Sequence, residues 1–255
     1  MTLPPPVAGL CDRFLRSAPT GLVHGLYLRG GIAFGEWVPG QSDVDFVAVL
    51  THPPSGDELA ALREVHEAMA EYSPVPFDGM YVQAEDLAAD PRDCPAGPTI
   101  VGGFWGEGTL DPVIAWHELD RSGIVVHGPP ITDLDVWTSQ DVLLDFTVDN
   151  LNTYWRSNAE SLAKMPSEGG AEDACCMFVL GVARLHHLLV TDEMTAKSAA
   201  GRWGLEHYPE RWHRVLREAL RVREGGPDEY GDDRDARGRD TAAFTAFVVA
   251  EASRN

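Results

Sequence analysis

A pair of glycines followed by two aspartates is the feature that most constrains the fold of this chain. Gly30 and Gly31 follow an apolar run that is typical of a strand. Paired glycines allow a tight turn into a short helix, whose free N–H groups hold phosphate oxygens well. A second strand-like run follows, and its period of two predicts that Asp43 and Asp45 share one face, roughly 6 to 7 Å apart. Two carboxylates are therefore expected beside a phosphate-binding turn.

Such an arrangement suits a magnesium–nucleoside triphosphate complex. Mg²⁺ prefers carboxylate oxygens together with the phosphate oxygens of a substrate. The alternative for Asp43 and Asp45 is a loop-to-strand transition with an Asx turn and one exposed acid. The preceding glycine turn and the apolar strand favour the metal site.

The Gly-Gly pair, the gap of eleven residues and the Asp-x-Asp resemble the nucleotidyltransferase motif of the DNA polymerase β superfamily. The whole chain is more closely similar to the bacterial aminoglycoside adenylyltransferases that modify streptomycin and spectinomycin. This resemblance implies Mg²⁺-dependent transfer of AMP from ATP to a hydroxyl of the antibiotic, with release of pyrophosphate. Asp43 and Asp45 are then the metal ligands. Nucleotide contacts fall on Gly30, Gly31 and Ser42, although the family usually carries Gly-Ser where this chain has Gly-Gly.

A third strand-like run, residues 75–82, contains a single acid, Asp78. The family places a third carboxylate, Glu in many relatives, on this neighbouring strand, where it faces the aspartate pair. A positioned carboxylate can accept the proton of a hydroxyl that attacks phosphorus. Asp78 is therefore predicted to be the general base. An edge-strand acid in water is the alternative.

The order of the patterns predicts an α/β fold with two domains. In residues 1–138, helical patterns alternate with strand-like runs, as in a nucleotidyltransferase domain with a mixed sheet. From residue 139 to 255 the period is helical throughout, which predicts an all-α bundle that closes a cleft for ATP and the acceptor. Residues 84–110 are expected to form a long loop or irregular insertion, and residues 225–240 an exposed charged loop.

The resemblance assigns two cations of the helical domain to the nucleotide. Lys197 lies in a segment similar to one whose lysine reaches the ATP phosphates, and Lys164 is the chain's other lysine. Arg184 lies in an otherwise apolar helix, where it must find an anion or extend its charged end to solvent. The alternative for Lys197 is a lysine on a helix surface.

The resemblance also assigns antibiotic contacts. The candidates are two tryptophans and three acids: Trp105, Asp111, Trp155, Glu172 and Asp173. Acids and aromatic rings suit guanidinium or ammonium groups, through charge and cation–π contact. The alternatives are packing for the tryptophans and helix N-termini for the acids.

The formal charge of −20 argues against nucleic acid as a partner, because a phosphate backbone would be repelled. It suits a cationic antibiotic, although a generally acidic surface also explains it. The four cysteines show no Cys-x-x-Cys spacing, so neither a zinc ribbon nor a disulfide framework is expected. The sequence contains no signal peptide pattern and no run of eighteen apolar residues, so we expect a cytoplasmic monomer without membrane contact.

Two rival functions remain open at this point. The first is a nucleotidyltransferase of the same fold that acts on another small-molecule or protein acceptor. The second is a catalytically lapsed protein that keeps the acidic cleft and only binds a cationic ligand. The three carboxylates and Lys197 favour an enzyme.

Overall fold

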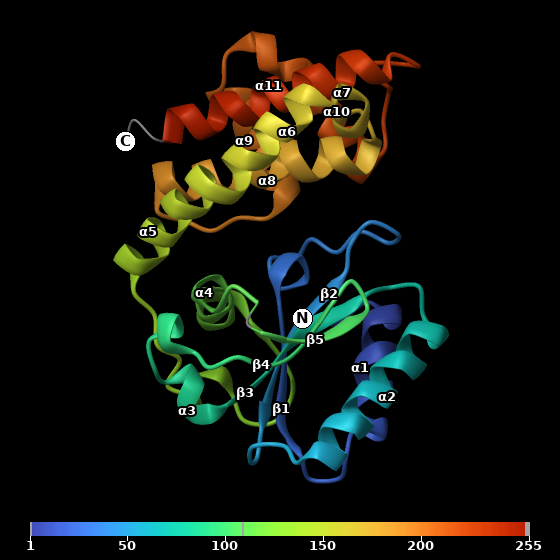
Figure 1. Cartoon of the computed structure of the whole chain (residues 1–255), viewed down its shortest axis with the longest axis vertical. Helices are drawn as coiled ribbons and strands as arrows, with labels where there is room; N and C mark the ends of the chain where they lie inside the picture. The colour runs from blue at the N-terminus through green and yellow to red at the C-terminus, as the bar shows by residue number, and fades with distance from the viewer. Residues whose placement is uncertain (1, 109, 253–255) are drawn as a thin grey trace. The chain divides into compact units, whose positions relative to one another are not determined.

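The computed structural model describes residues 2–108 and 110–252 of the chain. The chain divides into two compact units, Met1–Ser139 and Gln140–Asn255. The first unit combines a sheet with helices, whereas the described part of the second consists of helices and connecting loops (Figure 1). Each unit has a hydrophobic core of its own, as the two domains expected from the change of sequence period require.

The first unit is built on a mixed sheet with the strand order β5-β4-β3-β2-β1-β6. The strands are β1 (Val23–Arg29), β2 (Val44–Leu50), β3 (Phe77–Gln83), β4 (Gly97–Val101), β5 (Phe104–Gly108) and β6 (Ile124–His127). β2 and β3 are parallel, and the other neighbouring pairs are antiparallel. The registers place Asp45 of β2 opposite Asp78 of β3 and opposite Arg29 of β1.

Helices cover both faces of this sheet. Figure 1 shows α1 (Pro5–Ser17) and α2 (Gly56–Tyr72) on one face and α4 (Pro112–Ser122) on the other. Alternate residues of β2 point to opposite faces of the sheet. Phe46 packs in the core under α1 and α2, and Val47 packs in the core under α4. A strand buried on both faces reads as a continuous apolar run, which is why β2 stands out in the sequence.

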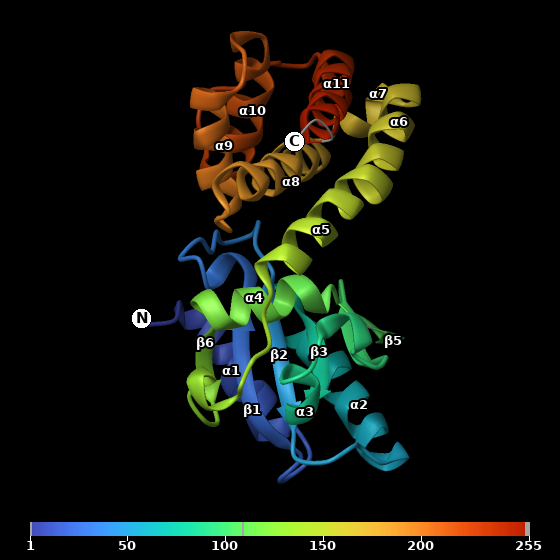
Figure 2. The ribbon, with the colours of Figure 1, turned by 90° about the vertical axis from the view of Figure 1, so that its left-hand side faces the viewer.

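The second unit is organised around a long apolar helix. Its helices are α5 (Gln140–Asn150), α6 (Arg156–Lys164), α7 (Pro166–Gly169), α8 (Glu172–Thr191), α9 (Lys197–His207), α10 (His213–Glu224) and α11 (Arg234–Ala252). A π-helical turn, Leu151–Trp155, joins α5 to α6, and the three run on as one long helical rod (Figure 2). α8 is long and apolar enough to cross a membrane, but half of it is buried inside the unit, as in the core helix of a bundle.

The prediction of a long irregular segment at residues 84–110 was wrong. The described residues there form a short helix, α3 (Ala84–Leu87), and the β4–β5 hairpin. Gly102 and Gly103 form the hairpin turn with φ of +57° and +79°. Two successive positive φ angles are the requirement of a tight hairpin turn, and a glycine pair meets it without strain.

The prediction of an exposed loop at residues 225–240 was wrong for the second half of this segment. α11 begins at Arg234, so the charged residues that follow belong to a helix. The remaining loop is held to the helices, because Tyr230 is only 5% exposed and its hydroxyl donates a 2.6 Å hydrogen bond to Asp240. Charge density alone therefore did not indicate a mobile segment here.

Candidate active site

Three carboxylates gather at the start of the two parallel strands. Asp45 and Asp78 are the second residues of β2 and β3, and they are paired in register. Adjacent strands lie about 4.8 Å apart, so the two side chains emerge as direct neighbours. Asp43 immediately precedes β2, and its negative charge acts on both of the other carboxyl groups. The structure thus brings together the three acids singled out in the sequence.

The Asp45 carboxyl group holds its proton unusually tightly. Burial raises its pKa from 3.8 to about 6, and the negative charges of Asp43, Glu118 and Asp78 act in the same direction. The positive charge of Arg29 opposes them. A cation bound beside Asp45 would stabilise its ionised form against the effect of burial.

The Asp78 carboxylate is held by the turn of the β4–β5 hairpin. The backbone N–H of Gly102 donates to Oδ2 at 2.7 Å, and that of Gly103 donates to Oδ1 at 3.4 Å. Burial raises the pKa of Asp78, the charge of Asp43 adds to this, and the two amide contacts lower it. Asp78 is half-buried and anchored, which the alternative of an edge acid in water did not predict.

The glycine pair makes a one-turn 3₁₀ helix, Gly30–Ile32, directly against Asp45. Gly30 has a φ of +67°, and a Cβ atom there would collide with Asp45 Oδ2. A Cβ atom at Gly31 would lie 2.9 Å from the carbonyl oxygen of Glu36. A serine at position 31 would therefore displace this backbone, which gives a local reason for the glycine that replaces the serine usual in the resembling family.

Ser42 lies two residues before the first residue of β2, Val44. Its Oγ accepts a 3.0 Å hydrogen bond from the backbone N–H of Val38. The hydroxyl hydrogen is not used in this contact, so the side chain can still donate to an anion. Ser42 is half-buried next to Asp43.

The site contains a cation that the sequence reasoning missed. The Arg29 side chain is 11% exposed; its Nη1 donates at 2.8 Å to Oε2 of Glu118, which is 3% exposed, and its Nη2 lies 3.9 Å from Asp45 Oδ1. Burial disfavours the charged guanidinium, but the charges of Asp45, Glu118 and Asp111 outweigh it and raise the pKa of Arg29. The available signals were one arginine ending an apolar strand and one glutamate on the buried side of α4.

The carboxylates fit a divalent cation that is shared with a substrate. Within residues 2–108 and 110–252, no group of three or more His, Cys, Asp and Glu side chains is arranged to hold a metal ion by itself. Mg²⁺ is commonly bound by one or two carboxylates plus substrate phosphates, and Asp43 and Asp45 provide such a pair beside the glycine turn. The pKa of Asp45 is raised mainly by burial, and the negative charges of Asp43, Glu118 and Asp78 add to this effect.

Trp105 packs on the sheet. Its ring centroid lies 5.9 Å from that of His66 and 6.0 Å from that of Tyr81, and the side chain is partly buried against the core. Asp111 is exposed and precedes α4 in a left-handed conformation, with φ of +44°. Its side chain makes no capping hydrogen bond, but its charge acts on Arg29. The structure thus relates Asp111 to Arg29 and packs Trp105 against the core, and the contacts of both residues with an antibiotic stay predictions.

In the helical unit, Trp155 is a core residue. It is 8% exposed, its ring stacks edge-on against Phe178 at 5.8 Å, and a Cβ atom at Gly181 would collide with it. Arg184 is half-buried on α8, and Lys197 is the half-buried first residue of α9. The roles of these two cations toward a nucleotide stay predictions.

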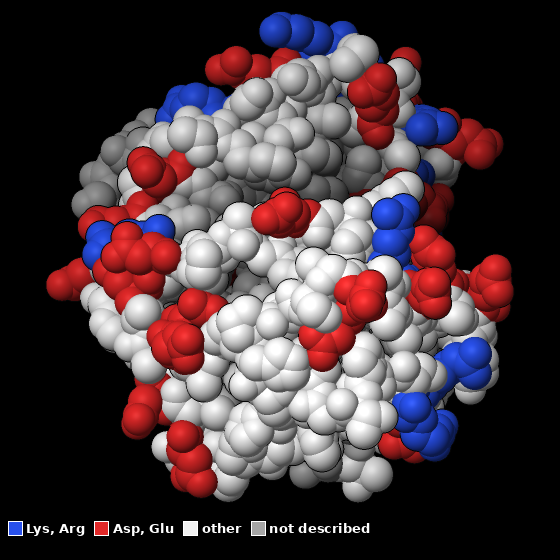
Figure 3. All heavy atoms as spheres, turned by 60° about the horizontal axis from the view of Figure 1, so that its bottom comes forward, with Lys and Arg blue, Asp and Glu red and all other residues white. Residues whose placement is uncertain are grey.

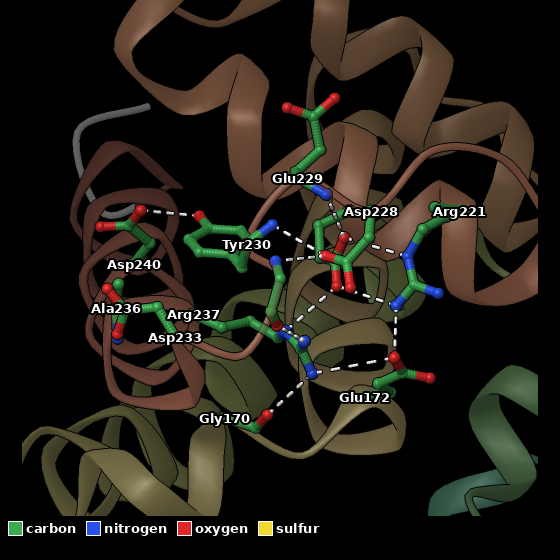
Figure 4. Close-up of polar contacts among 12 residues, drawn as sticks. Gly170, Glu172, Arg221, Asp228, Glu229, Tyr230, Asp233, Ala236, Arg237 and Asp240 are labelled. Carbon is green, nitrogen blue, oxygen red and sulfur yellow. Dashed lines mark hydrogen bonds and ion pairs between the residues drawn. The ribbon is translucent and has the colours of Figure 1, made fainter.

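Glu172 and Asp173 form the first turn of α8, as the N-terminal alternative predicted. Glu172 already has cationic partners: its Oε1 lies 2.6 Å from Arg221 Nη2 and 4.0 Å from Arg237 Nη1 (Figure 4). Both arginines also pair with Glu218, which is fully buried beneath them. Glu172 is therefore tied into an ionic cluster, whereas Asp173 is exposed.

The acidic side chains on one face of the molecule are dispersed. On the face drawn in Figure 3, Asp and Glu side chains are scattered among uncharged ones, and basic side chains are sparse. This distribution fits the generally acidic surface that was the alternative to a cationic partner. The charge of −20 by itself therefore does not locate a ligand.

Comparisons with known proteins bear on both units. Residues 148–251 match the family model described as aminoglycoside adenylyltransferase, C-terminal domain. A search of curated proteins gave no match. Among solved structures, spectinomycin adenyltransferase AAD(9) from Enterococcus faecialis, crystallised with ATP and spectinomycin, is similar with a TM-score of 0.69 at 14% identity, over 95% of this chain and 98% of that chain.

The structural match extends the likeness from the helical unit to the fold of the whole chain, including the sheet that carries the three carboxylates. At 14% identity this match shows a similar fold, and the family model covers residues 148–251 of the helical unit. The helical unit is thus similar to the C-terminal domain of aminoglycoside adenylyltransferases, and the whole chain has a fold similar to that of spectinomycin adenyltransferase AAD(9).

Proposed function

We propose that the protein is an adenylyltransferase that transfers AMP from ATP to a hydroxyl of an aminocyclitol antibiotic, spectinomycin or streptomycin. The observation that carries this proposal is the convergence of Asp43, Asp45 and Asp78 beside the Gly30 turn. The family of the C-terminal unit supports the acceptor class, and the ATP and spectinomycin of the similar structure support the pair of substrates.

The chain's own groups divide the work of the reaction. Asp43 and Asp45 would hold Mg²⁺, which, when bound, supplies positive charge to the phosphates of ATP. The turn at Gly30 offers backbone N–H groups to the same phosphates. Gly31 and Ser42 border this region, and the Ser42 hydroxyl has a hydrogen to donate.

Asp78 acts as the general base. The acceptor oxygen attacks the α-phosphorus, the bond from this phosphorus to the bridging oxygen breaks, and pyrophosphate leaves with that electron pair. The proton of the acceptor hydroxyl passes to an Asp78 carboxylate oxygen. The raised pKa of Asp78 suits this task, because a more basic carboxylate takes the proton more readily.

In this proposal the helical unit contributes cations, and each unit contributes an acid to the acceptor contacts. Lys197 and Arg184 balance the charge of the phosphates as pyrophosphate departs. Asp111 and Asp173 are exposed acids suited to ammonium or guanidinium groups of the antibiotic. Glu172 contributes less, since its charge is shared with Arg221 and Arg237.

An adenylylation assay over a small antibiotic panel tests the proposal. Purified protein is incubated with Mg²⁺, ATP labelled at the α-phosphate and spectinomycin, streptomycin or a set of other aminoglycosides. We expect labelled AMP on at least one aminocyclitol and stoichiometric pyrophosphate, both abolished in Asp45→Asn. Antibiotic binding by calorimetry without any transfer would instead support a protein that only binds a cationic ligand. Transfer to a protein acceptor alone would support the same-fold rival.

A further inference from the structure

The two anions that face Arg29 hold it unequally. Glu118 accepts a charge-assisted hydrogen bond from Nη1 at 2.8 Å, whereas Asp45 is 3.9 Å from Nη2, beyond hydrogen-bond distance. Arg29 and Glu118 are both almost completely buried, on β1 and α4 respectively, so their pairing is fixed by the packing of that helix on the sheet. The guanidinium is thus anchored through Nη1 to Glu118, and its other terminal nitrogen stays out of hydrogen-bond distance of Asp45.

Arg29 also has hydrogen-bonding capacity to spare. Its buried Nε has no hydrogen-bond partner among the described residues. A guanidinium that loses Glu118 would turn its free donors toward the remaining anion beside it, Asp45, whose Oδ1 lies 3.9 Å from Nη2. A bidentate pair there would occupy the oxygens that a divalent cation needs.

We propose that Glu118 is a positioning residue: it holds Arg29 away from Asp45, so that the Asp45 oxygens stay available to a divalent cation. This inference rests on the proposed metal role of Asp43 and Asp45. Together Arg29 and Glu118 carry no net charge, so the pair leaves the carboxylates attractive to a cation. Without Glu118, Arg29 is an unbalanced positive charge directly beside the site.

The third anion that acts on Arg29, Asp111, cannot replace Glu118. It is exposed, and solvent screens a charge at the surface far more than one in the interior. The loss of cation affinity should therefore follow from removal of the buried Glu118 charge and not from removal of an exposed acid. A matched control is available two residues further along α4, where Asp120 is exposed.

The test measures Mn²⁺ binding to the whole chain by electron paramagnetic resonance of the free ion, with and without an ATP analogue that cannot transfer AMP, because the carboxylates are expected to share the ion with phosphates. Glu118→Gln should lower Mn²⁺ affinity about tenfold, because it leaves one uncompensated charge next to the site. Asp120→Asn removes the same charge from the surface and should change affinity less than about twofold. The double variant Arg29→Met with Glu118→Gln removes both charges and should return the affinity to within about threefold of the unmodified protein.

The restoration in the double variant separates positioning from a merely structural role. Unchanged affinity in Glu118→Gln would overturn the inference, and so would a double variant that binds as weakly as Glu118→Gln. If circular dichroism shows that Glu118→Gln is unfolded, the double variant alone tests the inference. Mn²⁺ affinity near the unmodified value then supports the inference, and a large loss of affinity overturns it. An unmodified protein that binds no Mn²⁺ beyond that held by the ATP analogue would overturn the metal site itself, a result distinct from any change among variants.

Discussion

The carboxylate of Asp78 accepts a 2.7 Å hydrogen bond from the backbone N–H of Gly102, a residue 24 positions away at a hairpin turn. The turn requires positive φ at Gly102 and Gly103, which glycine adopts without strain. These two glycines therefore hold the backbone amide in the position that fixes the Asp78 side chain on β3. The same contact opposes the effect of burial on the pKa of Asp78. The turn therefore sets both the direction and the basicity of the proposed base.

Gly102→Val should impair transfer by disturbing this turn. A β-branched residue is strongly disfavoured at φ of +57°, so the amide should withdraw from Asp78. Loss of the amide contact raises the pKa of Asp78 further, and the acidic limb of the profile of log(kcat/KM) against pH should move to higher pH. We expect roughly a tenfold loss of kcat/KM at neutral pH.

Gly106→Val is the control for that experiment. Gly106 lies in the same hairpin, on β5, where a Cβ atom would make an ordinary 3.5 Å contact with Thr99. Valine suits a strand, so this variant should keep the pH profile of the unmodified protein. An equal shift in both variants would show that Asp78 senses the hairpin as a whole rather than the Gly102 amide.

Asp45→Asn should separate stability from activity. The folded pKa of about 6 lies above the ordinary value of 3.8, so the folded state binds the Asp45 proton more tightly than the unfolded state. The free energy of unfolding therefore falls as pH rises through this window, and above it the ionised carboxylate is destabilising. Asparagine mimics the protonated group, so the variant should be more stable at pH 8 without divalent ions, by on the order of 1 to 3 kcal/mol.

Thermal melting in a metal chelator checks this. The difference in Tm between variant and unmodified protein should be near zero below about pH 3, should grow between about pH 4 and 6 and should level off by pH 8. Added Mg²⁺ should raise the Tm of the unmodified protein at pH 8 and reduce the difference, since only that protein retains the full carboxylate pair. A variant less stable at pH 8 than the unmodified protein would mean that pairing with Arg29 outweighs burial.

Most of the sheet could be predicted because its main strands have a recognisable local sequence pattern. β1, β2 and β3 are apolar runs, and the same period of two that identifies them also assigns Asp45 and Asp78 to a face. The β4–β5 hairpin was missed because glycines and a proline occupy many of its positions. A glycine contributes no side chain to an alternating pattern, so the pattern disappears although the backbone pairs regularly.

The Arg29–Glu118 pair was missed for a different reason. Its members are 89 positions apart, and they meet only because α4 packs on the sheet beside β1. Neither residue carries a local motif. A hint existed in the charges themselves, because a charged side chain on a buried face needs a partner of opposite sign. Which partner it finds depends on tertiary packing.

Lys197→Ala should weaken the use of ATP more than the use of the acceptor. In the proposed reaction its ammonium group follows the charge that develops on pyrophosphate, so the variant should lose kcat and raise KM for ATP, with roughly a tenfold or larger loss of kcat/KM. Lys164→Ala is the matched control, because Lys164 is the chain's other lysine and lies exposed at the end of α6. Steady-state kinetics with ATP varied at saturating antibiotic compares the two. Equal kinetics in both variants would return Lys197 to the role of a helix-surface lysine.

Asp78→Asn tests the base directly, because a metal ligand and a base make different demands on a carboxylate. The amide keeps the shape and can accept a hydrogen bond from Gly102, but it cannot take a proton at neutral pH. ATP and Mg²⁺ should bind with near-native affinity in calorimetry, while single-turnover AMP transfer falls by roughly 10² to 10⁴-fold. Asp78→Glu keeps a carboxylate one methylene further out and should retain partial activity. Loss of ATP binding in Asp78→Asn would make Asp78 a third metal ligand, and full activity would show that its proton-accepting oxygen is not needed for transfer.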